Sequence, residues 1–236
     1  MFDHPMFRAV WSSLLPQNCL ICGEFFLGVG ACSICFSLLR RRLAPLCNTC
    51  GCSLNTELKT YSCLDCSLKR PIIDGIEAPF GYEPIAGQLL KYAKYASQPV
   101  ILKRLLSHLD MAKLDRFSVN TTRIVMIPDR VGRYMERGFS PSRMIAQTLA
   151  KTVHAPVDRF ALSWRRQTRR QTGLTRAQRS TNLVNAFKSR CVAGERILLV
   201  DDVYTTGYTL NEAAKTLKRA GAEHVHGFAL CYRDHG

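Results

Sequence analysis

The sequence is poor in acidic residues and has no long apolar run. It holds 18 Asp and Glu against 33 Lys and Arg, a net charge of +15. An excess of this size indicates polyanionic partners such as nucleic acid, phosphorylated small molecules or anionic lipid. No stretch approaches the roughly 18 apolar residues that span a bilayer. The first 17 residues also lack the pattern of a signal peptide, so we expect a cytoplasmic protein with no membrane span, either free or peripheral to the inner face of the membrane.

Acidic residues are scarcest in the segment 123–190, which has 15 Lys and Arg, 3 Asp and Glu, and a net charge of +12. The plainer interpretation of such a segment is a solvated surface that keeps the protein soluble. Because this one segment holds most of the excess charge, we favour a surface that binds phosphates.

Cysteine is almost absent after residue 70, whereas nine of the 11 cysteines precede it. Eight of them form four C-x-x-C pairs. One pair presents two thiolates to a tetrahedral ion and a second pair completes the shell, so the four pairs predict one or two structural zinc ions. The expected ligands are Cys19, Cys22, Cys32, Cys35, Cys47, Cys50, Cys63 and Cys66.

Sequential pairing of these C-x-x-C motifs is the simplest arrangement, and a crossed pairing stays open. Cys52 is a ninth thiol that could substitute in the second site. A thioredoxin-like redox role is less favoured, because that chemistry needs one such motif on an α/β scaffold.

The composition changes near residue 70, which predicts a single or double zinc ribbon over 1–70 and a second domain over 71–236. A zinc ribbon has almost no apolar core, so bound metal supplies its folding free energy. The run Arg40-Arg41-Arg42 between the C-x-x-C pairs favours additional contact with a phosphate backbone.

Strands alternate with helices in the second domain. Expected strands cover 72–82, 123–128, 196–200 and 224–232. Expected helices cover 84–96, 100–114, 140–152 and 210–220, the third beginning with Ser140 at the N-cap and Pro141 at N1. This alternation predicts an α/β fold, a mostly parallel sheet flanked by helices, with ligands at the carboxyl ends of the strands.

The segment ILLVDDVYTTGYT (197–209) places two acids after a buried strand. Asp201 and Asp202 can accept hydrogen bonds from a vicinal diol. The following Gly-containing turn opens a helix, and its backbone N–H groups form an anion site. The combination suits a sugar phosphate, although a helix after a core strand with two incidental acids is the plainer interpretation.

This segment closely resembles the phosphoribosyl pyrophosphate (PRPP) signature of type I phosphoribosyltransferases. The resemblance implies that Asp201 and Asp202 hold the ribose 2′ and 3′ hydroxyls, that the next loop holds the 5′-phosphate, and that Mg²⁺ accompanies PRPP. The loop residues are Thr205, Thr206, Gly207, Tyr208 and Thr209.

The order of four features resembles the ComF/GntX family of competence-associated proteins from Cys19 to Cys231. These features are the C-x-x-C pairs, RGF (137–139), QRSTNLVNAF (178–187) and VDDVYTTG (200–207). The resemblance implies a zinc ribbon joined to a phosphoribosyltransferase-like domain. It also implies uptake of transforming DNA, with the single strand handled on the cytosolic side of the membrane beside a helicase or single-strand-binding protein.

Two departures bear on catalysis. Asp129 follows the strand 123–128, where an acid would repel pyrophosphate, although Arg130 and Arg133 could offset it. Thr205 stands where purine-salvage enzymes carry an Asp general base, and a threonine cannot do that work at neutral pH. Orotate-type enzymes also lack that Asp, so transferase activity stays open and no catalytic residue is nominated.

The basic segment supplies the remaining candidates. Arg179 and Asn182 match the family pattern and are expected in a loop that closes over pyrophosphate. Arginines expected to bind DNA phosphates are Arg137, Arg165, Arg166, Arg169, Arg170 and Arg176. Aromatic residues available to stack on unpaired bases are Tyr134, Phe160, Trp164 and Phe187.

Three functions therefore compete. We favour a DNA-uptake protein that binds single-stranded DNA and PRPP. The second is an active PRPP-dependent transferase with an unidentified acceptor, and the third is a regulator that senses PRPP and binds duplex DNA.

Overall fold

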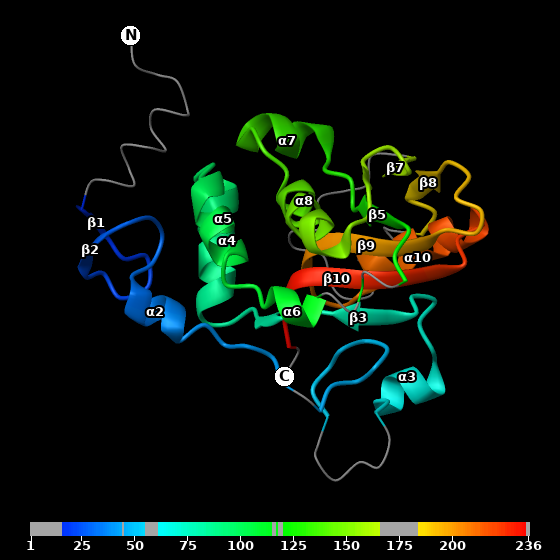
Figure 1. The fold of residues 1–236 in the computed structure, drawn as a ribbon, viewed down its shortest axis with the longest axis horizontal. Helices are drawn as coiled ribbons and strands as arrows, with labels where there is room; N and C mark the ends of the chain where they lie inside the picture. The colour runs from blue at the N-terminus through cyan, green and yellow to red at the C-terminus, as the bar shows by residue number, and fades with distance from the viewer. Residues whose placement is uncertain are drawn as a thin grey trace.

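The structure is a computed structural model that describes residues 16–43, 45–54, 61–114, 117, 120–165 and 184–234. A parallel sheet with the strand order β3–β10–β9–β5–β6 lies at its centre, and β4 pairs with the end of β10 (Figure 1). The strands are β3 (Gly75–Glu77), β4 (Phe80–Gly81), β5 (Arg123–Met126), β6 (Val157–Asp158), β9 (Arg196–Tyr204) and β10 (His224–Tyr232). The expected α/β fold is confirmed.

Helices cover both faces of the sheet. They are α4 (Ile85–Tyr95), α5 (Pro99–Leu106), α6 (Met111–Leu114), α7 (Val131–Arg137), α8 (Pro141–Val153) and α10 (Tyr208–Arg219). On β9, Leu198 and Val200 pack with α4, α5 and α8, whereas Ile197 and Leu199 pack with α10. Burial on both faces explains the continuous apolar run of this strand. Among the described residues, no helix is long and apolar enough to cross a membrane.

Several expected elements differ from the structure. The single helix expected over 100–114 is wrong, because the chain breaks between α5 and α6. There the Ser107 hydroxyl donates to the Arg104 carbonyl, and the Asp110 carboxylate accepts from the backbone N–H of Lys113. The strand expected over 196–200 continues to Tyr204, since its pairing with β10 extends to Tyr232.

Helix α7, strand β6 and a β-hairpin were not expected from the sequence. Helix α7 follows β5, and its last residue Arg137 is followed by Gly138 in the left-handed conformation. A hairpin of β7 (Leu162–Trp164) and β8 (Phe187–Ser189) lies beside α10. Ser140 does cap α8 as expected, its hydroxyl accepting from the Arg143 N–H at 3.2 Å.

The cysteine-rich region consists of short elements: β1 (Pro16–Asn18), β2 (Phe25–Leu27), α2 (Ser33–Ser37) and α3 (Leu64–Leu68). Its first half shares a hydrophobic cluster with the helices of the second domain, where Phe36 packs together with residues such as Leu89 and Ile101. Figure 1 shows α2 near α5 and α3 below β3. The domain boundary at residue 70 stays a prediction.

Candidate functional site

The two acids of the PRPP-like segment lie near the carboxyl end of β9. The Asp201 carboxylate accepts from the Asp202 backbone N–H at 2.8 Å and from the Ser142 hydroxyl at 3.3 Å. Burial, and then the negative charge of Asp202, raise the pKa of Asp201 to about 7. Two adjacent acids on a buried strand are therefore stable together only when one is protonated or a cation lies close.

Lys94 of α4 provides that cation. Its Nζ lies 2.5 Å from Asp202 Oδ2, and the two side chains are only 16% and 18% exposed. Sequence analysis missed Lys94, because nothing in its local pattern separates it from the exposed Lys91 one turn earlier.

Asp129 joins the same site from the end of β5. Burial and the charge of Asp202 raise its pKa, while Ser140, Arg137 and Lys94 act in the opposite direction. The expectation that an acid at this position faces the ligand site is consistent with this placement. Three carboxyl groups therefore converge at one edge of the sheet.

The loop after β9 has a shape suited to an anion. Gly207 has a φ of +73°, and a Cβ there would overlap the hydroxyl of Tyr204, so only glycine fits. Helix α10 begins at the next residue, and its first N–H groups have no acceptor within the helix. Positive electrostatic potential at this end of the helix favours a phosphate. The roles predicted for Thr205, Thr206, Tyr208 and Thr209 stay predictions.

The predicted basic residues that the structure describes make different contacts. The Arg130 guanidinium lies 5.0 Å from the Trp164 ring, and burial together with Arg133 lowers its pKa. Arg137 lies 5.9 Å from the Tyr95 ring and acts electrostatically on Asp129. Arg165 is exposed after β7. Arg166, Arg169, Arg170, Arg176, Arg179 and Asn182 lie outside the described residues.

Two of the four aromatic residues suggested for base stacking serve packing instead. Phe187 is 1% exposed and contacts the Trp164 ring at a centroid distance of 4.4 Å. The Trp164 indole N–H donates to the Pro128 carbonyl at 2.8 Å. The stacking role suggested for Phe187 is wrong because its ring is core, whereas Tyr134 and Phe160 are exposed.

The first four cysteines form one cluster. Cys19, Cys22, Cys32 and Cys35 place all four sulfur atoms within 4.8 Å of one another. The backbone N–H of Cys32 donates to the Cys19 sulfur at 3.3 Å. Burial alone would raise the pKa of Cys19, but N–H groups of Cys22, Cys32 and Ile21 lower it to about 6. Four thiols of this kind fit a structural zinc ion, and the sequential pairing of the C-x-x-C motifs agrees with this grouping.

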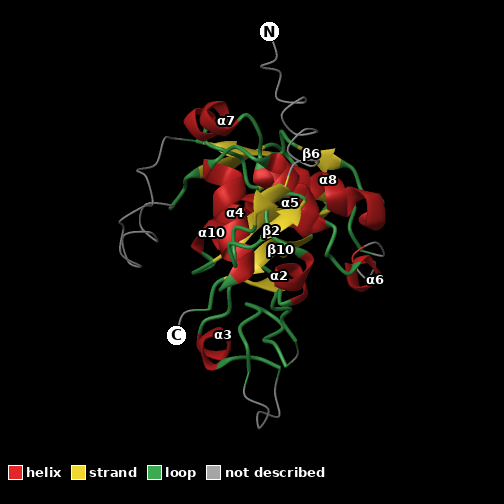
Figure 2. Cartoon of the chain, turned by 90° about the vertical axis from the view of Figure 1, so that its left-hand side faces the viewer, coloured by secondary structure: helices red, strands yellow, loops and turns green. Residues whose placement is uncertain are grey.

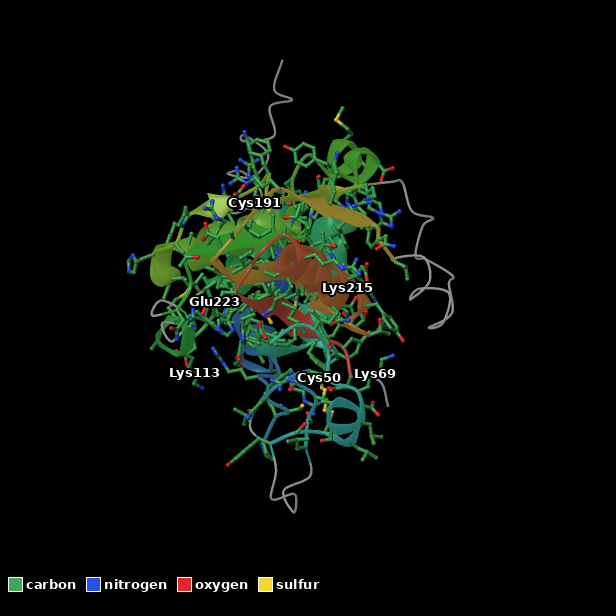
Figure 3. The ribbon with its side chains drawn as sticks, turned by 90° about the vertical axis from the view of Figure 1, so that its right-hand side faces the viewer. Cys50, Lys69, Lys113, Cys191, Lys215 and Glu223 are labelled. Atoms are coloured by element: carbon green, nitrogen blue, oxygen red, sulfur yellow. The ribbon has the colours of Figure 1, made fainter. Side chains whose placement is uncertain are left out.

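The second cluster repeats the geometry of the first. The N–H of Cys63 donates to the Cys47 sulfur at 3.4 Å, and the Cys50 and Cys63 sulfurs are 3.6 Å apart. The N–H of Cys66 donates to the Cys63 sulfur at 3.4 Å, as that of Cys35 does to Cys32. Figure 3 shows sulfur atoms gathered beside Cys50, below the sheet.

This second cluster holds five thiols. Cys47, Cys50, Cys52 and Cys63 have their sulfurs within 4.8 Å of one another. Burial raises the pKa of the Cys52 and Cys66 thiols, and hydrogen bonds from neighbouring thiols add to this effect. A tetrahedral zinc ion takes four ligands, so one of these two thiols is left out. The repeat of the first cluster favours Cys66 as the ligand.

Substitution of the two competing thiols tests this assignment. We expect wild-type protein to contain two zinc ions per chain and Cys66→Ser to contain one, because Cys52 has no counterpart in the first cluster and is not expected to replace the lost ligand. Cys52→Ser is the matched control and should retain two. Elemental analysis of purified protein measures the count; loss of zinc in Cys52→Ser with retention in Cys66→Ser would reverse the assignment.

The raised pKa of Asp201 predicts a pH-dependent stability. The folded protein holds the Asp201 proton more tightly than the unfolded chain, so this group's stabilisation decreases as the pH rises from about 4 to about 7. Asp201→Asn keeps the hydrogen-bond acceptor and removes this loss. We compare the free energy of unfolding of the variant with that of wild type at two pH values. The variant's advantage should be about 1–3 kcal/mol larger at pH 8 than at pH 5.

Urea denaturation at the two pH values measures this difference. Asp65→Asn on the surface of α3 is the matched control for the loss of one exposed carboxylate. An equal gain for Asp201→Asn at both pH values would contradict burial of an unfavourable charge.

Comparison with known proteins agrees with this geometry. A family model described as the phosphoribosyl transferase domain matches residues 136–236. Among solved structures, a purine phosphoribosyltransferase from Pyrococcus horikoshii Ot3 is 15% identical with a TM-score of 0.33 over 56% of this chain and 82% of its own. A score this low carries no argument, so the assignment depends on the sequence matches.

Relatives match nearly the whole chain. DNA utilization protein YhgH of Escherichia coli (strain K12) is 32% identical over 213 residues, which cover 86% of this chain and 90% of that protein. Competence protein F of Haemophilus influenzae is 29% identical over 85% of this chain and 90% of its own. Competence protein ComFC of Streptococcus pneumoniae is 29% identical over 91% and 99%. The chain therefore belongs to the ComF/GntX family of competence-associated proteins, with a phosphoribosyltransferase-like domain after its cysteine-rich segment.

Proposed function

We propose that this protein acts in the uptake of DNA during natural transformation, binding single-stranded DNA and PRPP at neighbouring sites. The observation that carries the proposal is the convergence of Asp201, Asp202 and the Gly207 loop at the carboxyl edge of the sheet. The names of the competence relatives support the biological role.

The acid pair and the loop bind different parts of PRPP. The ribose hydroxyls donate to the carboxylates of Asp201 and Asp202, and the 5′-phosphate accepts from the N–H groups that follow Gly207. Lys94 lies 2.5 Å from Asp202 Oδ2, and the second carboxylate oxygen of Asp202 is available to accept from a ribose hydroxyl. Mg²⁺ accompanies PRPP, since this cation prefers oxygen ligands from phosphates and carboxylates.

Calorimetric titration with PRPP and Mg²⁺ tests this site. We expect one PRPP per chain, and a loss of at least tenfold in affinity in the double variant Asp201→Asn, Asp202→Asn, because two charged acceptors become weaker neutral ones. Asp65→Asn should bind as wild type does. Unchanged affinity in the double variant would overturn the assignment of the acids.

Single-stranded DNA is proposed to bind the surface formed by α4 and α7. This α4–α7 surface consists of Lys91, Tyr92, Tyr95, Arg133, Tyr134 and Arg137. The helices are neighbours, since the Ser97 hydroxyl after α4 donates to the Glu136 carbonyl of α7 at 3.5 Å, and Figures 1 and 2 both show α7 above α4.

The exposed tyrosines favour an unpaired strand over a duplex. Tyr95 is 71% exposed, Tyr92 46% and Tyr134 42%. Each aromatic ring can stack on one base, which contributes about 1–3 kcal/mol per base, while the cations neutralise phosphates. A duplex offers no free base faces away from its ends, so only a single strand can use all three rings.

Substitution of two tyrosines tests the α4–α7 surface. Tyr95→Ala with Tyr134→Ala should weaken binding of a short single-stranded oligonucleotide by tenfold or more at constant salt, as measured by fluorescence anisotropy. Tyr61→Ala, which removes an equally exposed ring beside the second cysteine cluster, should not. Equal binding by the double variant and wild type would exclude this surface.

An active transferase is the second candidate. Asp129 supports it, because this carboxyl lies beside the acid pair and burial raises its pKa, which makes it a stronger base than an exposed carboxylate. Mg²⁺-dependent release of pyrophosphate from PRPP would identify this activity.

A further inference from the structure

A cavity of about 410 Å³ lies between α2 of the cysteine-rich region and α5. Its lining residues are Ser33, Phe36, Ser37, Leu39, Arg41, Arg104 and His108. None of them belongs to the acid pair, the Gly207 loop or the α4–α7 surface. The volume is within the range of sites that hold small molecules.

The lining of the cavity includes two arginines and a histidine but no acidic residue. Arg41 and Arg104 both act electrostatically on His108, whose pKa is lowered by burial and then by these two charges. Among the described residues, no carboxylate forms an ion pair with either arginine. The first cysteine cluster offsets part of the charge of Arg104.

The two guanidinium groups are held in place by neutral contacts. Arg41 Nη2 donates to the His108 carbonyl at 2.8 Å, and Arg104 Nη1 donates to the Val29 carbonyl at 2.8 Å. Arg104 also lies 4.5 Å from the Phe36 ring, and that ring stacks on His108 with a centroid distance of 4.5 Å and an interplanar angle of 5°. Each guanidinium has five N–H groups, so these carbonyls leave donors for a ligand. Little side-chain entropy remains to be lost on binding.

The three residues of the run Arg40-Arg41-Arg42 lie in different surroundings. Arg42 points to the protein interior, where its guanidinium lies 3.8 Å from the Tyr232 ring. Arg40 is exposed and does not line the cavity. Only Arg41 of the three therefore faces this space, so the run is not a uniform basic surface.

We propose that this α2–α5 cavity is a second anion site that binds the phosphate group of a nucleotide, with Arg41 and Arg104 as its charged donors. A phosphate carries up to two negative charges and accepts charge-assisted hydrogen bonds from two guanidinium groups. The volume exceeds that of a phosphate group alone and leaves room for the attached sugar, against the apolar wall formed by Phe36 and Leu39. The nucleotide is either free or part of a DNA strand, and both sources share this chemistry.

The test uses the full chain with the PRPP site weakened by Asp201→Asn and Asp202→Asn, and the comparison of Arg41→Ala with Arg40→Ala separates the cavity from any binding that remains at the Gly207 loop. Into this background we place Arg41→Ala, with Arg40→Ala as the matched control for the loss of one positive charge. Both positions are exposed, and unfolding curves and zinc content check that each variant is folded. The probes are adenosine 5′-monophosphate, adenosine, and a short single-stranded oligonucleotide, titrated by calorimetry at constant salt.

Three results are distinguishable. If adenosine 5′-monophosphate binds once per chain, adenosine does not, and Arg41→Ala alone weakens binding by tenfold or more, the site takes a free nucleotide. If only oligonucleotide binding weakens in Arg41→Ala and not in Arg40→Ala, the site takes a phosphate of a strand. If Arg41→Ala and Arg40→Ala bind every probe alike, the proposal is overturned, whatever the α4–α7 surface does.

Discussion

The parallel pairing of β9 with β10 and β5 is the constraint on which the site depends. This pairing holds β9 in register from its apolar start to Tyr204, so Asp201 and Asp202 are held near the carboxyl edge of the sheet. Burial and the charge of Asp202 raise the pKa of Asp201. The contact between Lys94 and Asp202 reduces the unfavourable electrostatic energy of placing two acids together. A protein with a large excess of cations therefore holds a small group of acids at the carboxyl edge of its sheet, with Lys94 as a neighbouring cation.

The same strands link the phosphate loop to the cysteine-rich region. Arg42 donates to the Gly51 carbonyl inside the second cysteine cluster, and its guanidinium stacks on Tyr232. Tyr232 in turn stacks on Tyr204 at 5.0 Å, and the Tyr204 hydroxyl lies beneath Gly207. A continuous set of contacts therefore joins this cluster to the loop, which gives the cysteine-rich region a role in supporting the site as well as in its own folding.

Local signals in the sequence predicted most of the helices and strands. The run of apolar residues predicted β9, and Ser140 with Pro141 predicted the start of α8, because both signals act within a few residues. The end of β9 and the break between α5 and α6 were predicted wrongly. The length of β9 depends on Tyr232, which pairs with its last residue, and the break depends on side-chain hydrogen bonds that compete with the helix.

The sequence by itself determined the acid pair, the glycine of the loop and the C-x-x-C pairs. The spacing of residues within each motif is enough to indicate what that motif can bind. Only the tertiary structure decided that Lys94 faces Asp202 and that Arg41 and Arg104 share one cavity. These contacts join residues far apart in the chain. They depend on how α4 and α5 pack against the sheet and the cysteine-rich region, which no local pattern specifies.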